Sequence, residues 1–179
     1  TGRNPNRYGI RDWIPDGKHT FLSRDETSVA TLLKRAGYST FLSGKWHLAS
    51  RLDGSEPGPG DHGFEHWFAT QNNALPNHLD PVNFFRDGRP VGPLKGHATT
   101  LVVDEAIRYL KQAGDRPFFL FVSFHAPHEP LAIAASEMNS YATVHEENRR
   151  VYFASVSLVD RELGRLVDAL DASGRSEST

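Results

Sequence analysis

Residues 118–124 read Phe-Phe-Leu-Phe-Val-Ser-Phe, an almost uninterrupted apolar run that follows Pro117 and precedes His125. Successive side chains of a strand point to opposite faces, so an apolar run of this length is typical of a strand covered on both faces in a parallel sheet. We therefore predict a doubly covered parallel strand here, and an α/β fold around it.

Amphipathic segments surround this strand in the sequence. Apolar residues recur at three- and four-residue spacing over residues 100–114 and 151–174, and each stretch predicts a helix that ends at a glycine. Upstream, residues 27–36 predict a short helix before Gly37, and residues 38–44 predict a second strand. This alternation predicts an α/β fold whose sheet is mixed or mostly parallel and is flanked by helices.

Two local features complete the expected architecture. The short helix has one apolar face, formed by Val29, Leu32, Leu33 and Ala36. Residues 64–93 are irregular and rich in Asn and Pro, so we expect a surface stretch, with a tight reversal at Asp87-Gly88.

Composition limits the classes of protein to which the chain can belong. Its 179 residues suffice for one domain, and 20 Lys and Arg against 22 Asp and Glu leave a net charge of -2, so neither nucleic acid nor an anionic membrane is an expected partner. There is no cysteine and no apolar run long enough to span a bilayer. The polar opening residues and the single methionine, Met138, indicate an internal piece of a longer protein.

Basic side chains follow both predicted strands, where ligands of open α/β sheets bind. Lys45 and His47 follow the first strand, and His128 follows the second between Pro127 and Pro130. If the backbone stays extended, Lys45 and His47 point to the same side. A lysine point charge and imidazole donors suit a tetrahedral oxyanion, and an imidazole can also transfer a proton near neutral pH.

Simpler interpretations apply to several of these residues. A lone Lys-x-His after a strand is more often a surface feature than an active site, and Trp46 is expected to pack. His125 directly follows the buried strand, and we expect it to be a core histidine bonded to a backbone carbonyl. The aspartates lack calcium-loop spacing and the histidines lack the paired spacing of a zinc helix, so no metal ligands are predicted within this chain.

Taken together and in order, the motifs resemble the sulfatase family of the alkaline-phosphatase-like superfamily, in its type I, formylglycine-dependent class. The likeness covers nearly the whole chain. It is carried by Thr1-Gly2-Arg3, residues 27–38, Gly44-Lys45-Trp46-His47-Leu48, Gly63-Phe64, Pro117-Phe118-Phe119-Leu120 and Ala126-Pro127-His128-Glu129-Pro130. The resemblance implies that residues 1–179 are the central part of an N-terminal catalytic sulfatase domain, truncated at both ends.

The resemblance also implies a role for four residues. Lys45 would hold the sulfate and the formylglycine hydroxyl, and His47 would bond that hydroxyl and help to expel sulfate from the covalent intermediate. His128 would bind sulfate and protonate the leaving alcohol, and Asn73 would line the substrate pocket. Calcium and formylglycine are expected in the full-length enzyme, whereas the ligands and nucleophile that would supply them are expected outside these residues.

The implied function is hydrolysis of a sulfate ester, either a small molecule or a sulfated glycan, in a lysosomal, secreted or periplasmic protein. The chain alone is expected to be inactive, because it lacks the nucleophile and the metal ligands. A phosphoesterase on the same fold remains an alternative, because phosphate and sulfate share size and geometry. A noncatalytic glycan- or anion-binding fragment remains the other alternative.

Overall fold

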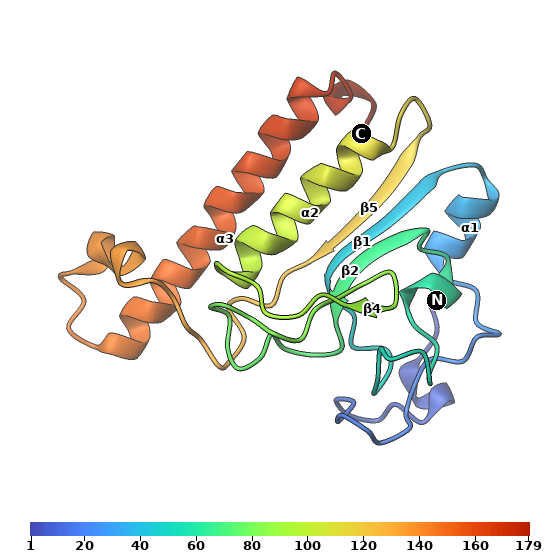
Figure 1. Ribbon diagram of the computed structural model, residues 1–179, viewed down its shortest axis with the longest axis horizontal. Helices are drawn as coiled ribbons and strands as arrows, with labels where there is room; N and C mark the ends of the chain where they lie inside the picture. Colours follow the sequence, from blue (N-terminus) through green and yellow to red (C-terminus); the bar gives the residue numbers. More distant parts are fainter.

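The computed structural model describes residues 1–179, with only the side chain of Ser178 outside the description. Three parallel strands form the centre of a sheet, because β1 (Ser39–Lys45) pairs with β2 (His66–Thr70) on one side and with β5 (Phe118–Ser123) on the other. Figure 1 shows these strands side by side. The predicted α/β fold with a mostly parallel sheet is confirmed.

A short hairpin extends the sheet beyond β2. β3 (Phe85–Arg86) and β4 (Arg89–Pro90) run antiparallel, which gives the strand order β4-β3-β2-β1-β5. The two turn residues have positive φ, 48° at Asp87 and 85° at Gly88, as a two-residue hairpin requires. The reversal predicted at this dipeptide is therefore confirmed.

The expectation that residues 64–93 form an irregular surface stretch is wrong for much of that segment. It contains β2, in which Trp67, Phe68, Ala69 and Thr70 are all buried. Phe84 and His78, farther along, are also fully buried. The run His66–Thr70 is short and follows a turn-rich loop. Both of its faces are buried because Phe68 packs in the cluster with α2, and Trp67 and Ala69 pack in the cluster on the other face.

The three predicted helices are present. α1 (Val29–Arg35) begins after Ser28, whose hydroxyl caps the N–H of Thr31. α2 (Ala98–Gln112) packs against the sheet, and α3 (Glu147–Ala172) packs alongside α2 (Figure 1). Four 3-10 turns complete the secondary structure: Pro5–Tyr8, Pro59–His62, Ala135–Tyr141 and Ser176–Ser178.

The apolar face predicted for α1 is wrong. Val29 and Leu32 are 55% and 56% exposed, and the helix is instead buried at Ala30. The reason is a close contact with Gly63, where an added Cβ would lie 2.4 Å from the backbone nitrogen of Thr31. That contact turns the small-residue side of the helix toward the protein.

The two sheet faces carry separate hydrophobic clusters. Phe41 and Phe68 pack with Val102 and Tyr109 of α2 on one face, whereas Leu42 and Trp67 belong with Ala30 of α1 to the other cluster. Strand residues alternate between the two clusters, as the period of a β-strand requires.

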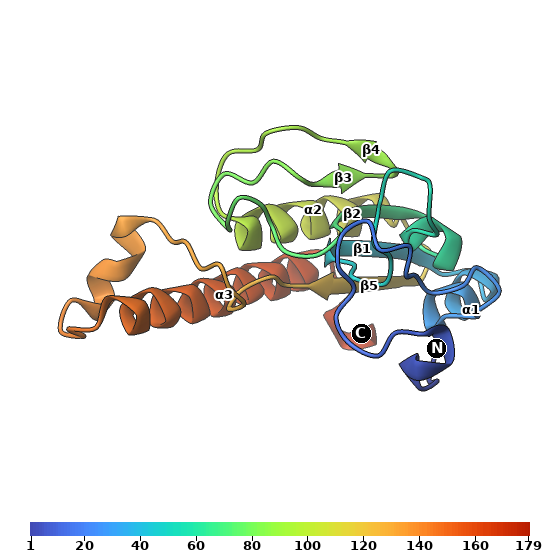
Figure 2. The same ribbon diagram turned by 90° about the horizontal axis from the view of Figure 1, so that it is seen from below.

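Strand β5 lies at the edge of the sheet, which corrects the prediction of a strand covered on both faces. Its residues are only partly buried, and Phe121 is 46% exposed. Phe118, Leu120 and Val122 pack on the α2 side of the sheet. On the other side Phe119 packs on the second cluster, and Phe121 is exposed among the described residues. Figure 2 shows β5 at one edge, β4 at the other, and α3 extending past the end of the sheet.

Among the helices of the described residues, none is both long and apolar enough to cross a membrane.

Candidate functional site

The polar residues singled out from the sequence follow the carboxyl ends of the three parallel strands. Lys45 ends β1, Asn73 follows β2 by three residues, and His128 follows β5. Because β2, β1 and β5 are adjacent and parallel, their ends lie at the same edge of the sheet. Strand geometry therefore brings together segments that are distant in the sequence.

A very close approach of two strands fixes the backbone that carries Lys45. Gly44 pairs with Ser123, and a Cβ at Gly44 would lie 1.9 Å from the Ser123 carbonyl oxygen. Only glycine fits this position, which also has φ +118°. The Ser123 hydroxyl donates to the Lys45 carbonyl oxygen at 2.7 Å, so the end of β1 is held from two directions.

A side-chain bridge connects Lys45 with the loop that carries His128. Lys45 Nζ donates to Asn73 Oδ1 at 3.1 Å. The amide nitrogen of Asn73 then donates to the Glu129 carbonyl oxygen at 2.7 Å and lies 3.1 Å from His128 Nδ1. Asn73 thus lies between the ammonium and the imidazole, and the structure brings these three predicted site residues together.

The proton of His128 can be assigned from its contacts. Its Nδ1 lies 2.6 Å from the Glu129 carbonyl oxygen, which can only accept a hydrogen bond, and 3.1 Å from the Asn73 amide nitrogen, which can only donate one. The contact with the carbonyl is the shorter, and the Asn73 nitrogen already has the same carbonyl as its acceptor. We therefore assign the proton to Nδ1, from the hydrogen-bond pattern. The other ring nitrogen, Nε2, remains available to a ligand, and the side chain is exposed.

His47 does not continue the extended strand, which corrects the expected i, i+2 alternation with Lys45. Its φ is +51°, in the left-handed region. Its Nε2 lies 3.1 Å from the Ile14 carbonyl oxygen, which also accepts from Gln71 Nε2 at 3.3 Å. Since a carbonyl only accepts, Nε2 carries the proton and Nδ1 is left with a lone pair in the neutral ring.

Burial and charge lower the pKa values of the basic groups at this edge. Partial burial lowers the pKa of the Lys45 ammonium. Burial also lowers the pKa of His47, and the nearby charges of Lys45 and His128 lower it further, whereas the bond to Ile14 opposes this. The neutral form of His47 is therefore favoured at pH 7, next to a lysine cation.

His125 is a buried support behind the site. It is 2% exposed, and its Nε2 lies 2.7 Å from the Thr70 hydroxyl, which donates to the Asn72 carbonyl oxygen. The expected core position is confirmed, but its partner is a hydroxyl instead of the predicted backbone carbonyl. Burial lowers the pKa of His125 to about 3, so the ring is neutral and its Nε2 donates.

Thr70 was missed as a site residue in the sequence. It ends β2, and its hydroxyl holds the Asn72 carbonyl directly before Asn73. The signal that could have revealed it was the β-prone run His66–Thr70, which would have placed a third strand end beside the other two.

No metal site forms among the described residues, since nowhere do three or more His, Asp or Glu side chains gather in a way that could hold an ion. The calcium that the resemblance implies therefore has no candidate ligand set in this part of the protein.

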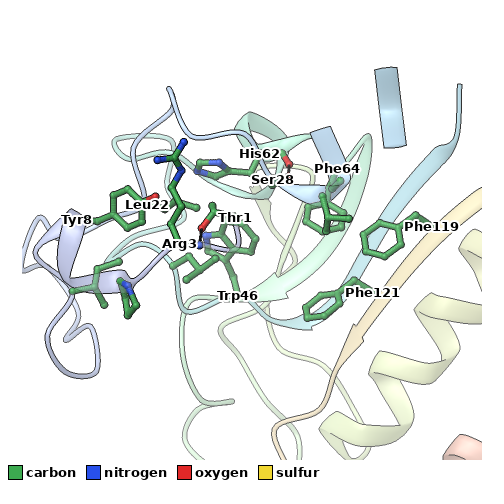
Figure 3. Close-up of a pocket in the computed structure, with 15 residues that line it drawn as sticks. Thr1, Arg3, Tyr8, Leu22, Ser28, Trp46, His62, Phe64, Phe119 and Phe121 are labelled. Carbon is green, nitrogen blue, oxygen red and sulfur yellow. Dashed lines mark hydrogen bonds between the residues drawn. The ribbon is translucent and has the colours of Figure 1, made fainter. Parts of the chain in front are cut away.

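Three hollows lie near these elements. One of about 550 Å³ is partly lined by Gln71 and Asn73, and one of about 1130 Å³ is partly lined by His128, so the two flank the bridge. The third, of about 310 Å³, is mostly apolar. Figure 3 shows Phe64, Phe119 and Phe121 at one end of it and Tyr8 at the other, and none of the predicted catalytic residues lines it.

Comparisons with known proteins agree on one family. The family profile described as Sulfatase matches residues 1–179. N-acetylgalactosamine-6-sulfatase from Canis lupus familiaris is 29% identical over 100% of this chain and 37% of its own length. N-acetylglucosamine-6-O-sulfatase from Bacteroides thetaiotaomicron is 35% identical over 68% of this chain and 20% of its own length.

A solved structure shares the fold. The protein Ps i-CgsB, in complex with k-i-k-neocarrahexaose, matches with a TM-score of 0.84 and 25% identity. The match covers 98% of this chain and 43% of that one. The chain therefore spans less than half the length of the relatives and structures named here.

Proposed function

Because the chain belongs to the sulfatase family, we propose that the whole protein hydrolyses sulfate esters, with Lys45, His47 and His128 acting on the ester. The observation that supports this most is the Asn73 bridge, which links Lys45 to the His128 loop at the edge where α/β sheets bind ligands. The bridge connects a cation and an imidazole at this edge, and both groups can bind a tetrahedral oxyanion.

Lys45 is proposed to bind the sulfate group. Its ammonium is a compact cation, and partial burial strengthens its attraction to an anion relative to open water. Asn73 accepts from this ammonium and so orients it, and is proposed to line the substrate pocket. The lowered pKa of Lys45 is compatible with this role, because a bound sulfate would favour the charged form again.

His128 is proposed to act as the general acid. Cleavage of the S–O bond leaves negative charge on the oxygen of the departing alcohol. With Nδ1 held on the Glu129 carbonyl oxygen, the protonated ring presents an N–H at Nε2. That proton passes to the alcohol oxygen as the bond breaks, and the alcohol leaves neutral.

His47 is proposed to act as the base of the same reaction. Its ring is favoured in the neutral form, and the bond from Nε2 to Ile14 leaves the lone pair on Nδ1. In the whole protein, Nδ1 would take the proton of the formylglycine hydroxyl and so help to expel sulfate, which is the role that the resemblance implies. The proton lost by His128 and the proton gained by His47 then balance.

Calcium and formylglycine are proposed for the whole protein on the resemblance alone. Such a calcium would act as a Lewis acid on sulfate oxygens. The described residues gather no metal ligand set, and we propose that the calcium ligands and the formylglycine both come from residues outside 1–179. For the same reason we propose that residues 1–179 alone do not turn over a sulfate ester.

The proposed substrate is a sulfated sugar, because named relatives and neighbours act on or bind such compounds. The relatives are named as sulfatases of N-acetylgalactosamine and N-acetylglucosamine, and one neighbour of 20% identity was solved with D-glucosamine-2-N,6-O-disulfate. A lysosomal, secreted or periplasmic location is proposed on the same family resemblance.

Release of inorganic sulfate by the whole protein tests this proposal. N-acetylgalactosamine 6-sulfate and N-acetylglucosamine 6-sulfate serve as substrates, with the matching 6-phosphates as controls. We expect sulfate release from at least one sugar, and a loss of at least about a hundredfold in Lys45→Ala. Preferential hydrolysis of the phosphates would favour the phosphoesterase alternative, and binding without hydrolysis would favour the noncatalytic one.

A further inference from the structure

The hollow beside Asn73 has no role in the chemistry proposed above. It measures about 550 Å³ and continues from Asn73 and Gln71 toward the N-terminal loop. Its lining brings together segments from four parts of the chain, represented by Trp13, Arg51, Leu75 and Phe85. Asn73 also contacts Lys45, so a substrate group that leaves the sulfate site on this side enters the hollow.

Trp13 differs from the other tryptophans of the chain. It is 60% exposed, whereas Trp46 and Trp67 are 8% and 7% exposed and belong to the core. A large aromatic ring at the rim of a hollow with both polar and apolar lining offers one apolar face to the C–H groups of a ligand. Sugar rings have such C–H faces together with hydroxyls at their edges.

The charges around the hollow argue for a neutral ligand. Arg51 contributes one cation, but its guanidinium already lies 3.6 Å from the Asp53 carboxylate. Asp16, which is exposed, adds a second carboxylate to the lining. One cation against two carboxylates repels a further sulfate, whereas carboxylates and a guanidinium can both bond sugar hydroxyls.

We propose that this hollow binds the sugar next to the sulfated one, with Trp13 stacking on a pyranose ring that carries hydroxyls and no second anionic group. The inference rests on the proposed sulfatase function and specifies its substrate as an oligosaccharide. Trp13 lies outside the predicted catalytic residues, so it determines which substrate binds and not the chemistry of the S–O bond.

A second hollow, lined by His128, offers a competing position. This larger hollow is partly lined by His128, Arg149 and Tyr152, and Tyr152 is 45% exposed. It has an exposed aromatic ring of its own, which makes Tyr152→Ala the matched control for Trp13→Ala. The two substitutions distinguish the direction in which the sugar chain extends.

The test compares kcat/KM for a 6-sulfated N-acetylhexosamine with that for a disaccharide in which the same sugar is linked to a neutral hexose. The whole protein is assayed as wild type, Trp13→Ala, Trp13→Phe and Tyr152→Ala. We expect Trp13→Ala to lower the ratio of disaccharide to monosaccharide kcat/KM about tenfold. Trp13→Phe keeps most of the ratio because it keeps a ring, and Tyr152→Ala leaves the ratio within about twofold.

If the wild type is active and Trp13→Ala leaves the ratio of disaccharide to monosaccharide kcat/KM unchanged, the subsite is overturned. A fall in this ratio in Tyr152→Ala alone would also overturn it. A disaccharide with a sulfated second sugar is expected to be the poorer substrate of wild type, and a preference for it would overturn the neutral-ligand assignment.

Failure of the proposed function gives a different result. If wild type releases sulfate from neither sugar, the function fails, and the subsite is then decided by fluorescence alone. Titration with the disaccharide that carries the neutral hexose should change the tryptophan fluorescence that Trp13 contributes. This contribution is the fluorescence of the wild type minus the fluorescence of Trp13→Phe. The absence of any change in that difference would contradict the subsite.

Discussion

Asn73 Oδ1 accepts a hydrogen bond from Lys45 Nζ at 3.1 Å, which joins the end of β1 to the loop after β2. The nitrogen of the same amide donates to the Glu129 carbonyl oxygen in the loop after β5. One side chain therefore touches all three segments that follow the parallel strands, and the relative position of Lys45 and His128 depends on it.

Removing this amide should reduce catalysis more than stability. We expect Asn73→Ala to lower kcat/KM for the sulfated sugar by about ten- to a hundredfold, because a hydrogen bond to a charged group contributes about 1.5–3 kcal/mol. Asn77→Ala, in the same loop, is the control and should change kcat/KM less than about twofold. Equal effects of the two substitutions would show that the bridge does not position Lys45 and His128.

The Thr70 hydroxyl should be required for both stability and activity. Thr70→Val leaves the buried Nε2–H of His125 without an acceptor, which costs about 1–3 kcal/mol of unfolding free energy. It also frees the Asn72 carbonyl, so kcat should fall as Asn73 shifts. Thr70→Ser keeps the hydroxyl and should restore most of both. Urea unfolding and sulfate release measure the two effects, and a fully active Thr70→Val protein would contradict the support role.

Gly44 should tolerate no side chain. A Cβ there would lie 1.9 Å from the Ser123 carbonyl oxygen, so Gly44→Ala must separate β1 from β5. We expect a loss of at least about 3 kcal/mol in unfolding free energy. Gly88→Ala is the control, because Gly88 also has positive φ but nothing within 4 Å, and its cost should be near about 1 kcal/mol. Similar losses of unfolding free energy in Gly44→Ala and Gly88→Ala would show that the close contact between β1 and β5 does not cause the destabilisation.

Acid should destabilise the protein through its buried histidines. Burial lowers the pKa of His125 to about 3 and that of His78 to about 4, from an ordinary value of 6.5. Below pH 6.5 the unfolded chain therefore binds protons that the folded chain does not. Unfolding free energy should fall as pH drops from about 6.5 toward 4, with about 1.4 kcal/mol per pH unit from each ring.

The variant His78→Leu isolates one of these contributions. His78 is fully buried and makes no hydrogen bond through either ring nitrogen, so leucine removes the titration without leaving a partner unpaired. The slope of unfolding free energy against pH should decrease by about 1.4 kcal/mol per pH unit. His145→Asn, at an exposed position, is the control. An unchanged slope in His78→Leu would mean that His78 is not kept neutral by burial.

The parts of the fold that were predicted correctly are those with a strong local pattern. The apolar run of residues 118–124 predicts strand β5 from local sequence alone. The three- and four-residue spacing of apolar residues in the last long segment predicts helix α3 in the same way. The strand-end position of Lys45 and His128 follows from these elements, because parallel strands place their carboxyl ends at one edge.

The features that were missed depend on tertiary position. β2 is only five residues long, and its burial comes from neighbours that are distant in the sequence. The left-handed backbone of His47 has no local signal, because the residue that typically marks such a position is glycine and not histidine. The exposure of Phe121 depends on which elements cover that face of the sheet, and residues 118–124 do not encode this.

The role of His128 as the acid is the central claim, and its dependence on the leaving group tests it most directly. The measurement is kcat/KM of wild type and His128→Gln in the whole protein, with 4-nitrophenyl sulfate and with the sulfated N-acetylhexosamine. A nitrophenolate leaves without a proton, whereas a sugar alcohol does not. We predict a loss of at least about a thousandfold for the sugar and less than about tenfold for the nitrophenyl ester. Equal losses for the two substrates would contradict proton transfer from His128.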